Sequence, residues 1–249
     1  MQFYSIGNVR IQTYSPSSGS TRIYHQYIKH HVLTMIGLPK NEVLVSTGAQ
    51  YLRLWDLDYP QKVRTLKTRI ACHHMVRDQR NNRVFMLEYG RHVVWGMNYT
   101  DNEATRLFQL SEKGPCQKMA LYDVNMTFFI NCNSKLMVVS ETGSVINHDL
   151  KRLESRYTYL TVDSFHGHLY INYNSSLQKF LLKEWHVDGV IYLKSSARIV
   201  IYDKGYIYYT YKNDTSYAIT VIDDTGLVKY ETVTFLNTEN SELLSLMPD

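Results

Sequence analysis

The sequence predicts an all-β chain folded as a single six-bladed β-propeller, from its repeat spacing, its strand-forming composition and the pattern at its two ends. One equivalent position, near the end of the third strand of each repeat, recurs at spacings of 43, 40, 44, 41 and 41 residues. Radial repetition at this period is typical of β-propellers. The six positions are Gln12, Trp55, Trp95, Val139, Phe180 and Val221.

Composition supports strands over helices. Hydrophobic residues make up 44% of the 249 residues, aromatic residues make up 13%, and tyrosine occurs 21 times. Aromatic and β-branched side chains favour pleated, half-buried strands. A closed array of repeats behaves as one unit, so we expect one domain over residues 1–249.

The second repeat shows the strand order most clearly, because apolar residues alternate between turn residues. Its four expected strands cover residues 32–36, 43–46, 52–56 and 63–66. The third repeat follows with 71–76, 84–87, 92–95 and 105–110, the fourth with 128–130 and 136–139, the fifth with 169–171 and 179–182, and the sixth with 198–202, 206–211 and 217–221.

Tyrosines crowd the sixth repeat. They could stack on bases or grip a peptide, but their alternation within strands favours packing between neighbouring blades. The residues concerned are Tyr202, Tyr206, Tyr208, Tyr209, Tyr211 and Tyr217.

The two ends of the chain together reproduce the residue order of a full repeat. Residues 242–249, joined to residues 2–12, follow the same order as residues 32–55. We therefore expect a C-terminal strand at 243–247 to pair with the N-terminal strands, so that the termini share one blade and close the ring.

One repeat also carries a family resemblance. Ser46-Thr-Gly48 followed by Leu52-Arg-Leu-Trp55-Asp56 resembles a WD40 repeat ending in its Trp-Asp dipeptide, and Val93-Val-Trp95-Gly is similar to a degenerate copy. The Gly-His dipeptide of that family is not at its usual place, since Gly167-His168 lies at a turn. The resemblance implies a non-catalytic platform for assembling complexes.

Cysteine usage and the N-terminal residues bear on location. The three cysteines, Cys72, Cys116 and Cys132, are odd in number and lack CxxC spacing, which favours reduced thiols over a disulfide framework. The start of the sequence shows no charged leader with an apolar run, and no segment reaches membrane-spanning length. We expect an intracellular protein, cytoplasmic or nuclear, with no membrane partner.

No residue pattern points to catalysis. Neighbouring residues on a strand face opposite sides, so the pairs His30-His31 and His73-His74 are poor metal chelators; His166 and His168 could converge but lack further ligands. Cys72 beside His73 is only sequence adjacency. We expect no enzyme activity, no cofactor and no metal.

The charged residues separate according to the loops in which we expect them to lie. The loops between the second and third strands and between blades, taken as the top, are basic, whereas the opposite loops are rich in Asp and Glu. Because Asp also favours turns, which would explain Asp78, Asp123, Asp163 and Asp203 at equivalent corners, the acidic side has a structural explanation as well. The candidate interaction rim is Lys67, Arg69, Arg91, His92, Lys113, Lys135, Lys151, Arg152, Lys194 and Lys212.

The sequence therefore predicts a non-enzymatic scaffold, a compact subunit of a larger intracellular complex. Its partners would be one or more protein subunits with an acidic contact surface opposite the basic rim. The alternative is a nucleic-acid or phosphopeptide binder acting through the same rim.

Overall fold

The computed structural model describes residues 10–15, 20–25, 32–59, 61–78, 80–111, 114–147, 153, 158–197, 199–213 and 216–234. These residues form 22 β-strands. Within them, no helix is long and apolar enough to cross a membrane. The strands divide into two compact units, with β1–β10 in unit 1 and β11–β22 in unit 2. The single domain expected from the sequence stays a prediction.

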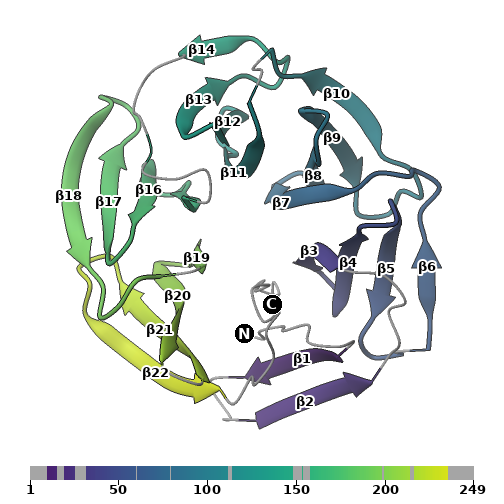
Figure 1. Ribbon diagram of the computed structural model, residues 1–249, viewed down its shortest axis with the longest axis horizontal. Helices are drawn as coiled ribbons and strands as arrows, with labels where there is room; N and C mark the ends of the chain where they lie inside the picture. The colour runs from purple at the N-terminus through teal and green to yellow at the C-terminus, as the bar shows by residue number, and fades with distance from the viewer. Residues whose placement is uncertain are drawn as a thin grey trace. The chain divides into compact units, whose positions relative to one another are not determined.

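Unit 1 contains one two-stranded sheet and two four-stranded antiparallel sheets. Figure 1 shows the strands of each sheet in chain order. The two-stranded sheet is β1 (Arg10–Ser15) and β2 (Ser20–His25); the next is β3 (Val32–Leu38), β4 (Glu42–Thr47), β5 (Leu52–Asp56) and β6 (Val63–Thr65); the third is β7 (Cys72–Asp78), β8 (Arg83–Glu88), β9 (Val93–Asn98) and β10 (Thr105–Gln109).

Unit 2 contains three four-stranded antiparallel sheets, again with neighbours in chain order. They are β11 (Cys116–Tyr122), β12 (Thr127–Cys132), β13 (Lys135–Val139) and β14 (Val145–Asn147); β15 (Leu160–Asp163), β16 (His168–Tyr173), β17 (Ser176–Leu181) and β18 (His186–Tyr192); and β19 (Ile199–Asp203), β20 (Tyr206–Asn213), β21 (Ser216–Asp223) and β22 (Val228–Thr234).

Short turns with positive φ fix the register of these hairpins. The turn between β12 and β13 consists of Asn133 and Ser134, with φ of 52° and 63°. Positive φ at both central residues is what a type I′ hairpin turn requires, and Asn adopts it readily. The twist of this turn matches the twist of the strands, so the two strands pair without a gap from Phe128 opposite Val139 to Cys132 opposite Lys135.

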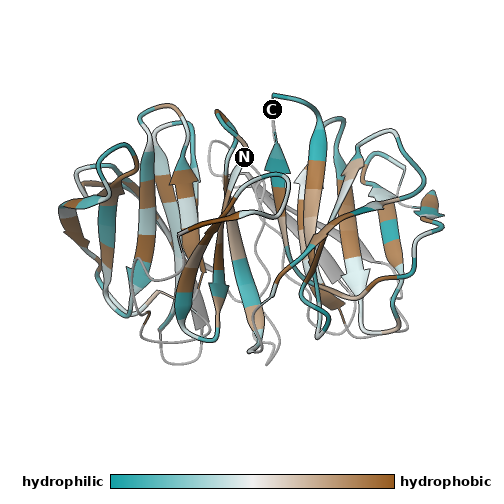
Figure 2. Cartoon of the chain, turned by 90° about the horizontal axis from the view of Figure 1, so that it is seen from above, coloured by the Kyte–Doolittle hydropathy of each residue, from teal (hydrophilic) through white to brown (hydrophobic). Residues whose placement is uncertain are grey.

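Each pair of neighbouring sheets within a unit buries its own apolar core. The first strands adjoin, β3 beside β7 in unit 1 and β11 beside β15 and β15 beside β19 in unit 2. Figure 2 shows apolar colouring along the strands, with many of the turns hydrophilic. The largest fully buried side chains include Phe85 in unit 1 and Phe128, Phe129, Tyr170 and Tyr209 in unit 2.

The prediction of six blades is wrong. The described residues form five four-stranded sheets, a five-bladed all-β arrangement, while the N-terminal residues expected in a sixth blade form only the two-stranded sheet of β1 and β2. The expected closing strand at 243–247 lies outside the described residues. Repeat spacing counts residues along the chain, whereas backbone hydrogen bonds decide which strands share a sheet.

The tyrosines of the sixth repeat are in part core residues, as expected. Tyr208, Tyr209 and Tyr211 are buried, Tyr202 is half-buried, and Tyr206 is exposed. Tyr217 is on β21, and its side chain lies outside the described part of the chain. Burial on β20 is continuous from Ile207 to Tyr211 and does not alternate, because β20 is a middle strand of its sheet; Tyr206 is its first residue and lies beside a turn.

The cysteines differ from the expectation of three reduced thiols. Cys116 on β11 lies directly opposite Cys132 on β12, and a disulfide joins them. Cys72 is free and fully buried, and burial raises the pKa of its thiol. Sequence spacing gave no signal for the pair, because 16 residues separate two cysteines that only strand pairing brings together.

Candidate functional site

In unit 2, one end of every sheet carries the turns that join first to second and third to fourth strands, because antiparallel strands alternate in direction. Two contacts join the end of the β15–β18 sheet to the end of the β19–β22 sheet. The Tyr202 backbone N–H donates to Thr161 Oγ1 at 2.9 Å, and the Tyr202 ring stacks on Tyr170 with centroids 5.7 Å apart. We call this end the turn face; it comprises residues 123–126, 140–144, 164–167, 182–185, 204–205 and 224–227.

Large apolar side chains are exposed on or beside the turn face. Phe165, in the β15–β16 turn, is 88% exposed, the highest value among the exposed large hydrophobic residues described. The others are Val124, Ile146, Trp185, Val187, Tyr206, Leu227 and Val228. At the opposite end of the same sheets, the turns β12–β13 and β16–β17 consist of Asn133, Ser134, Asn174 and Ser175. Most of the large exposed apolar residues of unit 2 thus lie on or beside the turn face, whereas Tyr192 lies at the opposite end of β18.

A buried carboxylate shapes the turn that presents Phe165. Asp163, at the end of β15, is 1% exposed, and its Oδ1 accepts the backbone N–H groups of Phe165 at 2.9 Å and His166 at 3.1 Å. Its Oδ2 lies 2.7 Å from His166 Nδ1, and the Tyr202 hydroxyl also donates to it. The turn therefore holds one shape, so Phe165 projects from a rigid base.

These bonds also set the charge state of Asp163. Burial alone would raise the pKa of its carboxyl, but the hydrogen bonds from the His166 N–H, the Tyr202 hydroxyl and the His166 ring outweigh it. The net result is a lowered pKa. Asp163 is thus held as a carboxylate, the form that accepts all of these donors.

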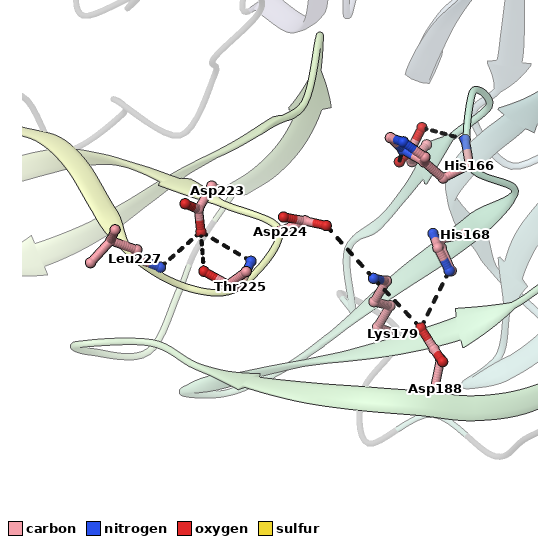
Figure 3. Close-up of polar contacts among 9 residues, drawn as sticks. His166, His168, Lys179, Asp188, Asp223, Asp224, Thr225 and Leu227 are labelled. Carbon is pink, nitrogen blue, oxygen red and sulfur yellow. Dashed lines mark hydrogen bonds and ion pairs between the residues drawn. The ribbon is translucent and has the colours of Figure 1, made fainter.

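A second set of charged side chains lies beside this turn, formed by His168 on β16, Lys179 on β17, Asp188 on β18 and Asp224 in the β21–β22 turn. We call it the Asp188 cluster. Asp188 Oδ2 is 3.3 Å from His168 Nε2 and 3.5 Å from Lys179 Nζ, and Lys179 Nζ is 3.9 Å from Asp224 Oδ2. Figure 3 shows the Lys179 ammonium between the two carboxylates, which come from different sheets.

Two buried polar atoms, Nδ1 of His168 in this cluster and the hydroxyl of Tyr170 beside it, have no hydrogen-bond partner among the described residues. Burial raises the pKa of Tyr170, and the carboxylates of Asp163, Asp224 and Asp188 raise it further. Burial and the Lys179 ammonium lower the pKa of His168. The Tyr170 hydroxyl therefore lies within the field of three carboxylates and bonds to none of them.

The β21–β22 turn is also fixed by an aspartate. Asp223 Oδ1 accepts the N–H groups of Thr225 and Leu227, both at 3.0 Å, and the Thr225 hydroxyl at 2.6 Å (Figure 3). Hydrogen bonds from Thr225 and Lys229 lower the pKa of Asp223. This turn carries Asp224 into the Asp188 cluster and leaves Leu227 exposed.

Acidic residues outnumber lysines on the turn face and on the strand residues beside it. Their number exceeds that of the lysines around them, and the acids come from all three sheets of unit 2. The acidic residues are Asp123, Glu141, Asp163, Glu184, Asp188, Asp203, Asp223 and Asp224; the lysines are Lys179, Lys183, Lys204 and Lys229. The face therefore combines exposed apolar groups with net negative charge.

The basic rim predicted from the sequence is divided between the two units. Lys67, Arg69, Arg91 and His92 belong to unit 1, and Lys135, Lys194 and Lys212 belong to unit 2. Lys113, Lys151 and Arg152 lie outside the described residues. A single rim formed by all ten stays a prediction.

Several of the rim residues already have partners. Arg91 Nη1 lies 3.6 Å from Glu88 Oε1, and Lys194 Nζ lies 2.9 Å from Glu231 Oε1. The Arg69 guanidinium lies 5.6 Å from the centre of the Tyr51 ring. Lys67 donates its backbone N–H to the carbonyl of Asn102, in the connection between β9 and β10. That connection is at the other end of its sheet from the β8–β9 turn of Arg91 and His92.

Catalytic and metal chemistry find no support among the side chains that the structure describes. There, no group of three or more His, Cys, Asp or Glu residues could hold a metal ion. Asp163 and His166 form the carboxylate and imidazole parts of a catalytic triad, but a nucleophile must also bond the imidazole. In the described part of the chain, no hydroxyl or thiol bonds the His166 ring.

Sequence reasoning missed the turn face as an apolar surface. It placed Asp163 at a turn, and it noted His166 and His168 only as weak metal ligands. A signal was present, because Ser164-Phe165-His166-Gly167 puts a large aromatic residue in a short turn directly after a corner aspartate. An exposed aromatic in a structured turn is a stronger functional indication than one on a strand.

Comparisons with known proteins establish the fold. No protein-family model and no curated protein sequence matches the chain. Among similar solved structures is a crystal structure of a nidogen/laminin complex, with a TM-score of 0.76 and 10% sequence identity over 98% of this chain and 97% of the matching chain. That similarity is to the nidogen propeller and not to WD40 proteins specifically. The chain therefore has a β-propeller fold.

Proposed function

We propose that this chain is a non-enzymatic protein-interaction module that engages its partner through the turn face of unit 2. The observation that carries the proposal is Phe165, an aromatic side chain 88% exposed on a turn that buried Asp163 holds in shape. Aromatic anchors dominate binding energy at protein interfaces. A turn already held in its bound shape loses little conformational entropy on binding.

The fold comparison supports a protein partner. The similar nidogen propeller was solved in a complex with laminin. The apolar residues around Phe165 would form the centre of such a contact, and the acidic residues would form its rim, as in most protein interfaces. Carboxylates repel a phosphate backbone, so nucleic acid is not proposed as a ligand of this face.

The binding proposal predicts that Phe165→Ser lowers the yield of a co-purifying partner. The tagged full-length chain, isolated from its native cell, would be compared with the variant by quantitative mass spectrometry. We expect recovery of the partner to fall by about tenfold or more, because the change removes an anchor side chain.

Tyr192→Ser is the matched control. Tyr192 is also highly exposed, at 82%, but it ends β18 at the opposite end of the sheet from the turn face. Its replacement should leave recovery unchanged. Equal recovery with Phe165→Ser and wild type would show that the turn face is not the contact surface.

Membership of a larger intracellular complex is a further part of the proposal, and the disulfide makes it testable. Disulfides persist in oxidising compartments and are rare in the cytosol. If the protein works in the cytoplasm or nucleus, alkylation of the cell-derived protein, unfolded without reductant because Cys116 and Cys132 are buried, should label both cysteines. Intact-mass measurement that finds the two cysteines linked would instead place the protein in an oxidising compartment.

A further inference from the structure

We propose that the turn face recognises a basic segment of the protein partner, and that an arginine side chain of this segment binds between Asp188 and Asp224. The inference rests on the proposed function, since it names the chemistry of the partner at the same face. It differs from the expectation of an acidic partner at a basic rim, because the site is acidic.

The two carboxylates keep most of their binding capacity. Asp188 is 39% exposed and Asp224 is 51% exposed at the side chain. Their ion pairs with Lys179 are long, at 3.5 and 3.9 Å, beyond the 2.7–2.9 Å typical of a strong charged hydrogen bond. Each carboxylate offers about four acceptor positions, so both have room for a further donor.

Tyr170 gives an independent indication that the site takes a donor. It is 1% exposed, it lies opposite Lys179 in the pairing of β16 with β17, and its hydroxyl has no hydrogen-bond partner among the described residues. A buried, unbonded hydroxyl is costly. A guanidinium N–H that enters between the carboxylates, with a small shift of Lys179, would donate to the phenolic oxygen.

The two carboxylates of the cluster already converge on a cation, which shows that the site accommodates positive charge. Figure 3 shows the Lys179 ammonium between Asp188 and Asp224. A guanidinium suits the site better than a second ammonium, because its planar group of five N–H donors can bond two carboxylates at once. The net negative charge of the turn face adds attraction for the rest of a basic segment.

An apolar contact lies next to the charged one. The Phe165 ring contacts the His166 ring with centroids 4.7 Å apart, and the His166 and His168 rings are 6.3 Å apart. His168 in turn reaches Asp188. A short segment could therefore place an arginine at the carboxylates and an apolar residue on Phe165.

Two pools of short immobilised peptides would test the inference. They differ at one position, arginine in one and neutral citrulline in the other, with Gly, Ser, Leu and Phe mixed at the remaining positions. The full-length chain should bind the arginine pool roughly tenfold more strongly than the citrulline pool, because citrulline keeps the shape of arginine but loses its charge.

Three variants assign the effect to the site. Asp224→Asn and Asp188→Asn should each remove most of the preference for arginine. Glu184→Gln should keep it, because Glu184 is an equally exposed acid of the turn face outside the cluster. Asp224→Asn is the cleaner change, since it leaves the bond between His168 and Asp188 intact; thermal unfolding would confirm that each variant is folded.

The outcomes separate this inference from the proposed function. Equal binding of the two pools, or a preference that survives Asp224→Asn and Asp188→Asn, overturns the arginine site. If partner capture still depends on Phe165 in that case, the protein-binding proposal stands alone. If Phe165→Ser does not affect capture while the pools respond as expected, the site binds cations and the assigned contact surface fails.

Discussion

Replacing Asp78 with alanine is expected to lower the free energy of unfolding by about 3 kcal/mol, because it removes a fully buried carboxylate that accepts hydrogen bonds from Asn81 and Arg83. Asp78 ends β7 and is fully buried. Its carboxylate accepts the backbone N–H and side-chain amide of Asn81 at 3.1 and 2.9 Å, and Nε and Nη2 of Arg83 at 3.1 and 3.0 Å.

Asp56→Ala is the matched control for this prediction. Asp56 makes a similar turn, accepting the N–H groups of Asp58 and Tyr59 at 3.0 and 3.2 Å, but it is only half-buried. Water can bond the Asp58 and Tyr59 N–H groups once the carboxylate is removed. We therefore expect the free energy of unfolding to fall by about 1 kcal/mol, which is similar to the loss of a capping side chain at a helix N-terminus. Urea unfolding would measure both. Equal losses would contradict the assigned importance of burial.

A methyl group added at Gly114 is expected to destabilise unit 2 by about 2–3 kcal/mol, the upper range for overpacking. A Cβ at this position would lie 2.4 Å from Cβ of Asn133 and 2.6 Å from its Cγ. Asn133 cannot swing away easily, because its backbone N–H donates to the Pro115 carbonyl at 2.8 Å. Either the connection before β11 or the β12–β13 turn must shift.

The second substitution Asn133→Gly should restore stability to Gly114→Ala. Asn133 has a φ of 52°, a value that glycine adopts readily. Removing its side chain removes the colliding atoms. Thermal unfolding of the wild type, both single variants and the double variant forms a complete cycle. If the stability losses of the two single variants simply add in the double variant, the collision is not the cause.

The sequence predicted the two middle strands of each four-stranded sheet more consistently than the edge strands. Strands such as β4, β5 and β8 agree with the expected ranges within one or two residues, because short runs of mostly buried apolar residues mark them. Five edge strands, β11, β14, β15, β18 and β22, were not predicted from the sequence; the residues of β18 and the described side chains of β22 are mostly exposed. An edge strand pairs with only one other strand and contributes few side chains to the core, so its apolar and polar residues need not alternate.

The candidate site depended on three-dimensional pairing more than on local pattern. Corner residues such as Asp163 were assigned to turns correctly, since Asp favours that position. The Asp188 cluster joins residues from β16, β17 and β18 with a turn of the next sheet. Only the folded arrangement brings Lys179 to Asp224, 45 positions later in the printed sequence, so no spacing rule could find it.

Asp163 fixes the backbone shape of its turn but does not determine which side chains the turn presents. The carboxylate binds the backbone N–H groups of residues 165 and 166, which every residue except proline supplies. Residue 165 can therefore change by mutation without altering the path of the turn. A turn built in this way can present a different side chain to a different ligand while the strands keep their fold. This agrees with a fold that is shared at 10% sequence identity.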